Sequence, residues 1–165
     1  MNVEIVGCKG EIHDKEEFIE RIRRFGDENK AICQIMNADM VYGREHILSA
    51  VEHALRAFEN GTNSCKTPDM EILLYASGKR QIKDAIEFMG IGKSGKFVFV
   101  YAGNGNPGIE EFLEELGLEV DSNVMDGDIL TLDKFGIGDE EMKTVDKSMY
   151  GDLILEKVAM VDLIK

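Results

Sequence analysis

Three glycines form the motif in this sequence that comes closest to a known site for chemistry. Gly103, Gly105 and Gly108 follow a strand pattern and precede a helix pattern, as in a dinucleotide-binding turn. Glu110 and Glu111 would lie in the first turn of that helix, where a pyrophosphate has to bind, and their charges oppose it. We interpret the motif as a glycine-rich turn. A nucleotide-binding enzyme that uses the Gly103–Gly108 turn is the alternative function.

The other residues capable of catalysis or metal binding are not arranged for either. His46 and His53 are seven positions apart, which separates them by about 10 Å along a helix. We expect His46 to lie at the edge of an apolar stripe and to make one hydrogen bond. The three cysteines contain no C-x-x-C pair, which favours reduced thiols in the cytoplasm. No serine lies in a nucleophile motif. We therefore predict a protein that is not an enzyme and binds no metal or cofactor.

A short basic segment is the best candidate for a binding site. Lys79, Arg80 and Lys83 follow the break at Ser77 and Gly78, and we expect them to begin a helix that runs to Met89. On that helix Lys79 and Lys83 would share a face. One interpretation is an ordinary solvated helix face. The other is a phosphate or base-edge site, because the first N–H groups of a helix lack partners.

The charge distribution decides where nucleic acid could bind. The net charge of −13 opposes phosphate binding in general. Residues 110–141 contain twelve acids and one base, whereas residues 44–96 contain eight bases and seven acids. Only the middle third of the chain is therefore suited to a nucleic-acid surface. The longest uncharged stretch, Phe97–Ile109, is too short to cross a bilayer, so we expect no membrane association.

These candidates have to be positioned by alternating strands and helices. Strand patterns cover residues 3–8, 31–36, 96–102 and 118–124, and helix patterns cover 44–59, 67–77, 79–89 and 107–116. A further helix begins at the Asp14 cap and ends at Gly26, and residues 126–144 show no clear pattern. We predict one domain over residues 1–165, of class α/β (α+β), with a small mixed sheet packed with several helices.

The last segment is apolar on nearly every side of the helix that we expect from Asp146 onward. A strand over residues 157–164 is less favoured, because no turn residue precedes it. A helix that is apolar all round is either buried at the centre of the protein or covered in part by a partner. The residue pattern leaves both interpretations open.

The sequence resembles a known family in the segments Gln34–Asp39, His46–Leu48, Glu71–Gly78, Gln81–Ile82, Ala85–Ile86 and Gly90–Ile91, together with Ala50. This family is that of the small kinase-binding subunits of the KEOPS complex (the TPRKB-like family). The resemblance implies a non-catalytic subunit that binds the kinase-like ATPase subunit directly and the other KEOPS subunits indirectly. It also implies recruitment of tRNA through the CCA end for threonylcarbamoyladenosine synthesis.

The resemblance further implies two sets of binding residues. The expected tRNA contacts are Asn37, His46, Tyr75, Ser77, Gly78, Lys79, Arg80 and Gln81. The expected kinase contacts are Leu153, Ile154, Val158 and Val161 of the last helix. Because the chain is acidic, we expect the free subunit to bind tRNA weakly without its partners. A purely structural partner without RNA contact is the other alternative.

Overall fold

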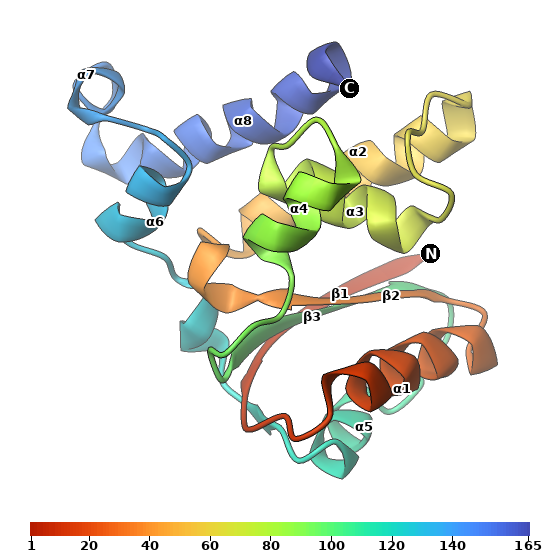
Figure 1. Cartoon of the computed structure of the whole chain (residues 1–165). Helices are drawn as coiled ribbons and strands as arrows, with labels where there is room; N and C mark the ends of the chain where they lie inside the picture. Colours follow the sequence, from red (N-terminus) through yellow and green to blue (C-terminus); the bar gives the residue numbers. More distant parts are fainter. The chain divides into compact units, whose positions relative to one another are not determined.

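The computed structural model describes residues 1–165, which contain eight α-helices and one four-stranded sheet (Figure 1). Backbone contacts group the chain into two compact units, residues 1–39 with 91–125 and residues 40–90 with 126–165. The predicted class, α/β (α+β) with a small sheet and several helices, is confirmed. The single domain over the whole chain stays a prediction.

The first unit contains the sheet, with α1 and α5 on one of its faces (Figure 1). Its elements are β1 (Asn2–Lys9), α1 (Lys15–Glu28), β2 (Ile32–Asn37), β3 (Lys96–Gly103), α5 (Ile109–Glu115), β4 (Glu119–Val120) and a 3-10 turn at Ser122–Met125. The strand order is β2-β3-β1-β4, with Ile5 opposite Val100 and Ile35 opposite Phe99. Every pairing is antiparallel, so the expected mixed sheet is corrected to an antiparallel one.

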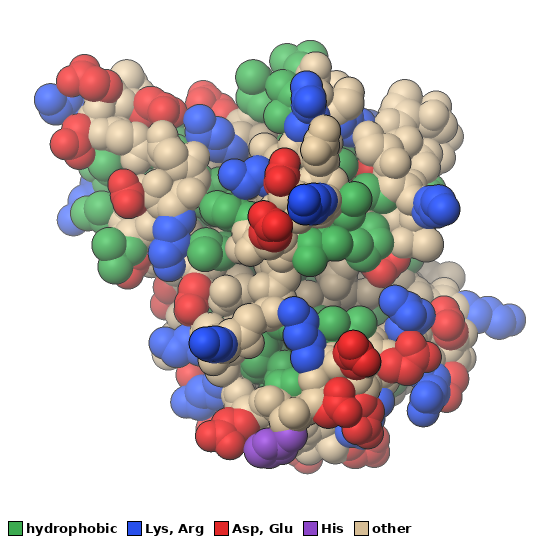
Figure 2. All heavy atoms as spheres, viewed as in Figure 1, with side chains coloured by type: hydrophobic (Ala, Val, Ile, Leu, Met, Phe, Trp, Pro, Cys, Tyr) green, Lys and Arg blue, Asp and Glu red, His purple; other side chains and the backbone are tan.

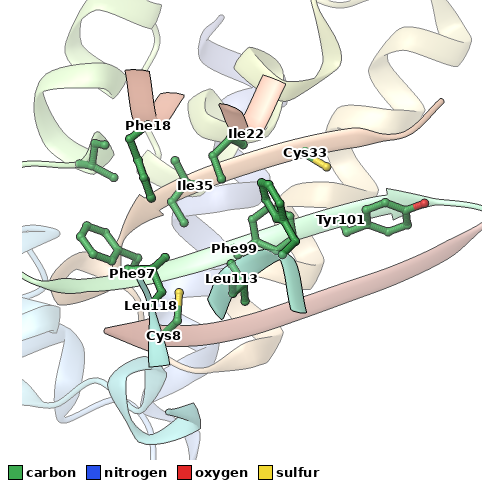
Figure 3. Close-up of a cluster of buried hydrophobic side chains, with 12 residues drawn as sticks. Cys8, Phe18, Ile22, Cys33, Ile35, Phe97, Phe99, Tyr101, Leu113 and Leu118 are labelled. Carbon is green, nitrogen blue, oxygen red and sulfur yellow. The ribbon is translucent and has the colours of Figure 1, made fainter. Parts of the chain in front are cut away.

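The core of this unit combines aromatic and aliphatic side chains (Figure 3). Side chains of α1 and α5 pack against one face of the strands. The helices contribute Phe18, Ile22, Phe112 and Leu113, and β3 contributes Phe97, Phe99 and Tyr101. Phe25 stacks on Phe112 with ring centroids 3.9 Å apart. The Asp14 cap is confirmed, since its carboxylate accepts the Glu17 N–H at 3.1 Å.

The second unit is helical. Its elements are α2 (Arg44–Asn60), α3 (Pro68–Ser77), α4 (Ile82–Met89), α6 (Ile129–Lys134), α7 (Asp139–Met142), a 3-10 turn at Lys147–Met149 and α8 (Tyr150–Ile164). A further 3-10 turn covers Ala38–Met40. Helix α2 packs on α3 and α8, and α3 packs on α4. The unassigned stretch therefore contains two short helices, of which α6 begins with a capping box between Asp128 and Thr131.

Several element boundaries differ from the expectation. The helix expected from Lys79 begins at Ile82. The strand expected over residues 118–124 is reduced to Glu119–Val120, because the chain turns into the 3-10 helix at Ser122. The first helix continues past Gly26 to Glu28. The helical interpretation of the last segment is confirmed, although α8 starts at Tyr150.

Candidate functional site

The connection from α3 to α4 contains the basic residues of the candidate binding site. Helix α3 ends because Gly78 adopts a left-handed conformation, with φ of +69°, and donates its N–H to the Tyr75 carbonyl. The Ser77 hydroxyl donates to the Leu74 carbonyl at 2.8 Å and accepts the Lys79 N–H at 3.1 Å. These bonds turn the chain out of the helix and hold Lys79 outside any helical turn.

The basic residues of this connection are therefore arranged differently from the prediction. Lys79 and Lys83 do not share a helix face, since Lys79 precedes α4. The half-buried Lys79 places its ammonium 4.6 Å from the centroid of the Phe88 ring. Arg80, Gln81 and Lys83 are exposed. The cationic surface of this segment thus consists mainly of Arg80 and Lys83.

His46 is a buried structural residue and not a residue at the edge of an apolar stripe. Its side chain is 1% exposed and makes two hydrogen bonds, not the single one expected. Nδ1 accepts the Tyr42 N–H at 3.0 Å, so Nε2 carries the proton and donates to the Ala76 carbonyl at 2.8 Å. Burial lowers the pKa of His46 to about 4, against the opposing effect of the Ala76 carbonyl. The imidazole is neutral near pH 7 and joins α2 to α3.

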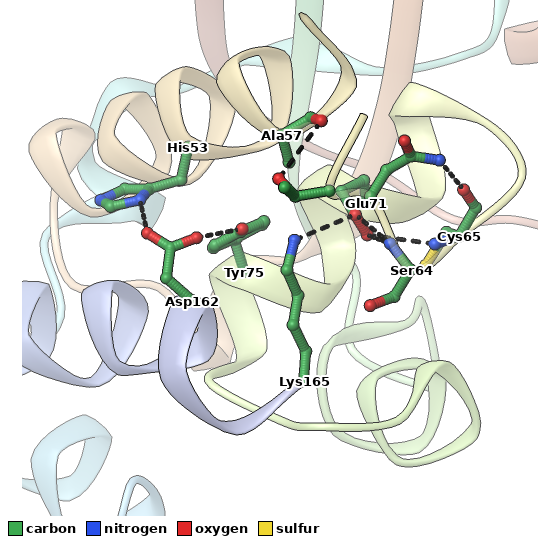
Figure 4. Close-up of polar contacts among 10 residues, drawn as sticks. His53, Ala57, Ser64, Cys65, Glu71, Tyr75, Asp162 and Lys165 are labelled. Carbon is green, nitrogen blue, oxygen red and sulfur yellow. Dashed lines mark hydrogen bonds and ion pairs between the residues drawn. The ribbon is translucent and has the colours of Figure 1, made fainter. Parts of the chain in front are cut away.

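Tyr75 is also buried, and it belongs to a polar cluster that joins α2, α3 and α8 (Figure 4). Its hydroxyl donates to one oxygen of Asp162, and the other oxygen lies 2.9 Å from Nδ1 of His53. The His53 ring stacks on the Tyr75 ring at 5.3 Å. Burial acts to raise the pKa of Asp162, but the hydrogen bonds from Tyr75 and His53 outweigh it and hold the pKa below its usual range.

Glu71 is the second anchor of this cluster. It is fully buried in α3, and its carboxylate accepts the N–H groups of Ser64 at 2.9 Å and Cys65 at 3.1 Å. Lys165 forms an ion pair with it at 3.6 Å and lies over the ring of Tyr75 (Figure 4). Glu71 therefore fixes both the α2–α3 loop and the end of α8.

The expected tRNA contacts thus fall into three groups. His46, Tyr75 and Ser77 are buried in the second unit, and their polar atoms are engaged inside the fold. Gly78, Lys79, Arg80 and Gln81 lie together at the surface of the same unit. Asn37 belongs to the first unit, where its side-chain oxygen accepts the Asp39 N–H at 2.9 Å. On the face drawn in Figure 2, acidic and basic side chains are interspersed over α1 and α5.

The expected kinase contacts lie inside the protein. Leu153, Ile154, Val158 and Val161 are between 0 and 4% exposed and face the core of the second unit. Two of them, Leu153 and Ile154, pack with Leu132 and Ile137. Of the two interpretations of the apolar pattern, burial in the protein's own core therefore describes this face of α8. The apolar side chains that α8 exposes are Met160, Leu163 and Ile164, at 48, 79 and 40%.

The glycine-rich turn is poorly suited to a nucleotide. Gly108 caps α5 in a left-handed conformation, with φ of +70°, and the helix has only seven residues. The carboxylate of Glu111 lies 3.1 Å from the position that a Gly108 Cβ would occupy, and Glu110 shares the first turn. The space at this helix start is therefore filled with negative charge.

The remaining candidates for reactive sites are metal ligands and the cysteine thiols. No three side chains of His, Cys, Asp or Glu lie close enough together to hold a metal ion. All three cysteines are buried and none forms a disulfide, and burial raises the pKa of Cys8 to about 12, so that this thiol stays protonated. None of the helices is both long enough and apolar enough to span a membrane.

Sequence reasoning missed the cluster formed by His53, Glu71, Asp162 and Lys165. The contacting pair His53 and Asp162 is 109 positions apart in the sequence, so no local pattern relates the members of the cluster. One signal was present, since Glu71 interrupts an otherwise apolar run from Met70 to Ala76. An acid on the buried side of a helix has to find partners, and that requirement could have directed attention to the neighbouring loop.

Comparison of the sequence with known proteins identifies a matching family and two similar proteins. Residues 11–160 match the family described as kinase binding protein CGI-121. The KEOPS complex subunit Cgi121 of Pyrococcus abyssi is 35% identical over 113 residues, which are 67% of this chain and 62% of that protein. The regulatory protein Cgi121 of Methanocaldococcus jannaschii is 31% identical over 132 residues, which are 80% of this chain and 84% of that protein. The aligned region thus spans less than two thirds of the Pyrococcus relative.

Proposed function

Since the chain belongs to the CGI-121 family of kinase binding proteins, we propose that it is a non-catalytic KEOPS subunit that binds the complex's kinase-like ATPase. The observation that carries the proposal is the family match, which extends over residues 11–160. The protein would act in the cytoplasm, where its three buried thiols stay reduced.

The kinase-facing surface is proposed to be the exposed apolar part of α8. Met160, Leu163 and Ile164 lie on the last turns of the helix, and Met160 and Leu163 are three positions apart on one side. Exposed apolar side chains that gather on one helix end are typical of a protein interface. The four residues first expected there would support this surface from the core.

Charge substitution on α8 tests this surface. Met160→Glu together with Leu163→Glu should weaken association with the kinase-like subunit by at least about tenfold, because a charge would be buried in the contact. Val120→Glu in β4 is the matched control, since Val120 is 42% exposed and lies in the other unit. Equal co-purification of the double variant and the control would move the interface away from α8.

We also propose that the subunit recruits tRNA through its CCA end for threonylcarbamoyladenosine synthesis. The candidate surface is the connection from Gly78 to Lys83, where Arg80 and Lys83 are exposed and the first N–H groups of α4 carry no side-chain cap. With a net charge of −13 on the chain, two cations contribute only weak affinity. Stable binding would therefore require the other subunits of the complex.

The matching experiment measures tRNA binding by the assembled complex. Arg80→Glu with Lys83→Glu should lower the affinity and reduce the salt slope by roughly 1.4, at about 0.7 per lost phosphate contact on single-stranded RNA. Lys143→Glu with Lys147→Glu is the control, because it changes the net charge equally at other exposed positions. Removing the CCA end should have a similar effect to the first pair. If tRNA without CCA binds equally well, the subunit is a structural partner without this RNA contact.

A further inference from the structure

A cavity of about 270 Å³ lies between the end of α2 and the last turn of α8. Its polar lining consists of His53, Arg56, Asn60, Thr62, Asp162 and Lys165. All of these residues belong to the second unit. The volume is below the range of about 300 to 1,000 Å³ that is usual for drug-sized ligands, so the cavity fits a chemical group better than a whole large molecule.

The ammonium of Lys165 is the unusual feature of this lining. The side chain is 7% exposed, and its Nζ finds no hydrogen-bond acceptor in the protein. Its contacts are the ion pair with Glu71 at 3.6 Å and the ring of Tyr75 at 4.7 Å. An ammonium has three donors, and buried donors are normally hydrogen-bonded. Lys165 thus lines the cavity with an enclosed ammonium whose donors are not taken up by a protein acceptor.

The remaining lining groups favour an acceptor that carries negative charge. Arg56, Asn60 and Thr62 can all donate, and Arg56 adds a second positive charge. Asp162 is the one acidic side chain of the lining, and both of its carboxylate oxygens are engaged by Tyr75 and His53 (Figure 4). A metal ion in this cavity would face two cations without a free carboxylate, which disfavours it.

The end of α2 does not cancel this preference. Carbonyls at a helix C-terminus carry partial negative charge and would repel an anion. Here the Ala57 carbonyl accepts the Thr62 N–H at 2.8 Å, and the Phe58 carbonyl accepts the Gly61 N–H at 3.3 Å. Arg56 and Lys165 thus contribute positive charge to the lining of a cavity beside a helix end that is already capped.

We propose that this cavity binds a phosphate group, with Lys165 and Arg56 supplying charge and Asn60 and Thr62 supplying hydrogen bonds. Phosphate oxygens accept several hydrogen bonds at once, which matches a donor-rich lining. The group can come from a free nucleotide or from the backbone of RNA. The site does not use the Gly78–Lys83 connection, so it stands apart from the proposed tRNA contact.

Titration of the full chain with inorganic phosphate at constant ionic strength tests the proposal, with the His53 ring resonances as the readout. We expect saturable shifts, and Lys165→Met and Arg56→Gln should each weaken binding by about tenfold or more. Lys157→Met, which removes a cation of α8 that does not line the cavity, should leave phosphate binding unchanged. Arg56 is exposed, so its variant stays informative if Lys165→Met loses folded structure. Wild-type affinity in Arg56→Gln, or shifts that chloride reproduces, would overturn the proposal.

Two further ligands identify the source of the phosphate. AMP that displaces inorganic phosphate from the wild type but not from Arg56→Gln would indicate a free nucleotide. A short single-stranded oligoribonucleotide with that behaviour would indicate an RNA backbone. If neither displaces inorganic phosphate, the cavity takes no phosphate ester and the proposal fails. Arg80→Glu with Lys83→Glu should retain inorganic phosphate binding, so failure of the tRNA proposal is distinguishable.

Discussion

The two units of this protein are stabilised by different kinds of core. The first unit packs aromatic and aliphatic side chains of α1 and α5 against the sheet. All four buried polar residues of the chain, His46, Glu71, Ser77 and Thr131, belong to the second unit. Apolar packing tolerates exchange of shape, whereas a buried polar group requires a particular partner. The second unit therefore combines the specific contacts with the candidate binding surfaces.

The largest expected difference comes from one substitution in each of the two cores. Glu71→Gln in the second unit leaves the Lys165 charge and part of the amide bonding uncompensated, which should cost about 3 to 5 kcal/mol. Phe99→Leu in the first unit removes apolar contacts only and should cost about 1.5 kcal/mol. Urea unfolding of both variants measures the difference. Equal losses would mean that the cores do not differ in this way.

The next largest expected effect is on the dependence of the folding stability on pH. The pKa of His46 is lowered to about 4 in the folded state, so the unfolded state binds the extra proton. The stability linked to this residue is full above about pH 6.5 and is lost as the pH falls towards 4, by about 3 kcal/mol in total. His46→Gln should remove this part of the slope. His13→Gln, at an exposed position of the first unit, should leave it in place.

Deleting one hydroxyl from each unit should give a smaller contrast. Tyr75 donates to the Asp162 carboxylate, whereas Tyr101 donates to the Asn104 carbonyl at 3.0 Å. A hydrogen bond to a charged group is worth about 1.5 to 3 kcal/mol and a neutral one about 0.5 to 1.5. Tyr75→Phe should therefore cost more than Tyr101→Phe in thermal unfolding, and the reverse order would contradict the comparison.

The sequence predicted the local elements better than the contacts between them. Phe97 to Tyr101 had to be a strand, and Asp14 and Pro68 marked helix starts, because these signals act over a few residues. The start of α4 was missed, since the hydroxyl of Ser77 and the left-handed Gly78 determine how the chain leaves α3. No periodicity indicates such a side-chain bond.

The candidate site could be predicted only in part, and for a related reason. The exposed basic segment at Arg80 and Lys83 was visible as charge. The apolar pattern of α8 could not tell a buried face from a docking face, so Ile154 and Val158 were assigned to a partner although they fill the core. The cluster around Glu71 and Asp162 depends on pairings over long separations, which a single sequence does not encode locally.

Association with the kinase-like ATPase subunit is the most direct test of the proposed function. Isothermal titration of the full chain with that purified subunit should show saturable one-to-one binding. The Met160→Glu and Leu163→Glu variant should lose most of the heat, while Val120→Glu should keep it. No binding by the wild-type chain, in the presence of nucleotide or without it, would contradict the assignment of this protein as the kinase-binding subunit.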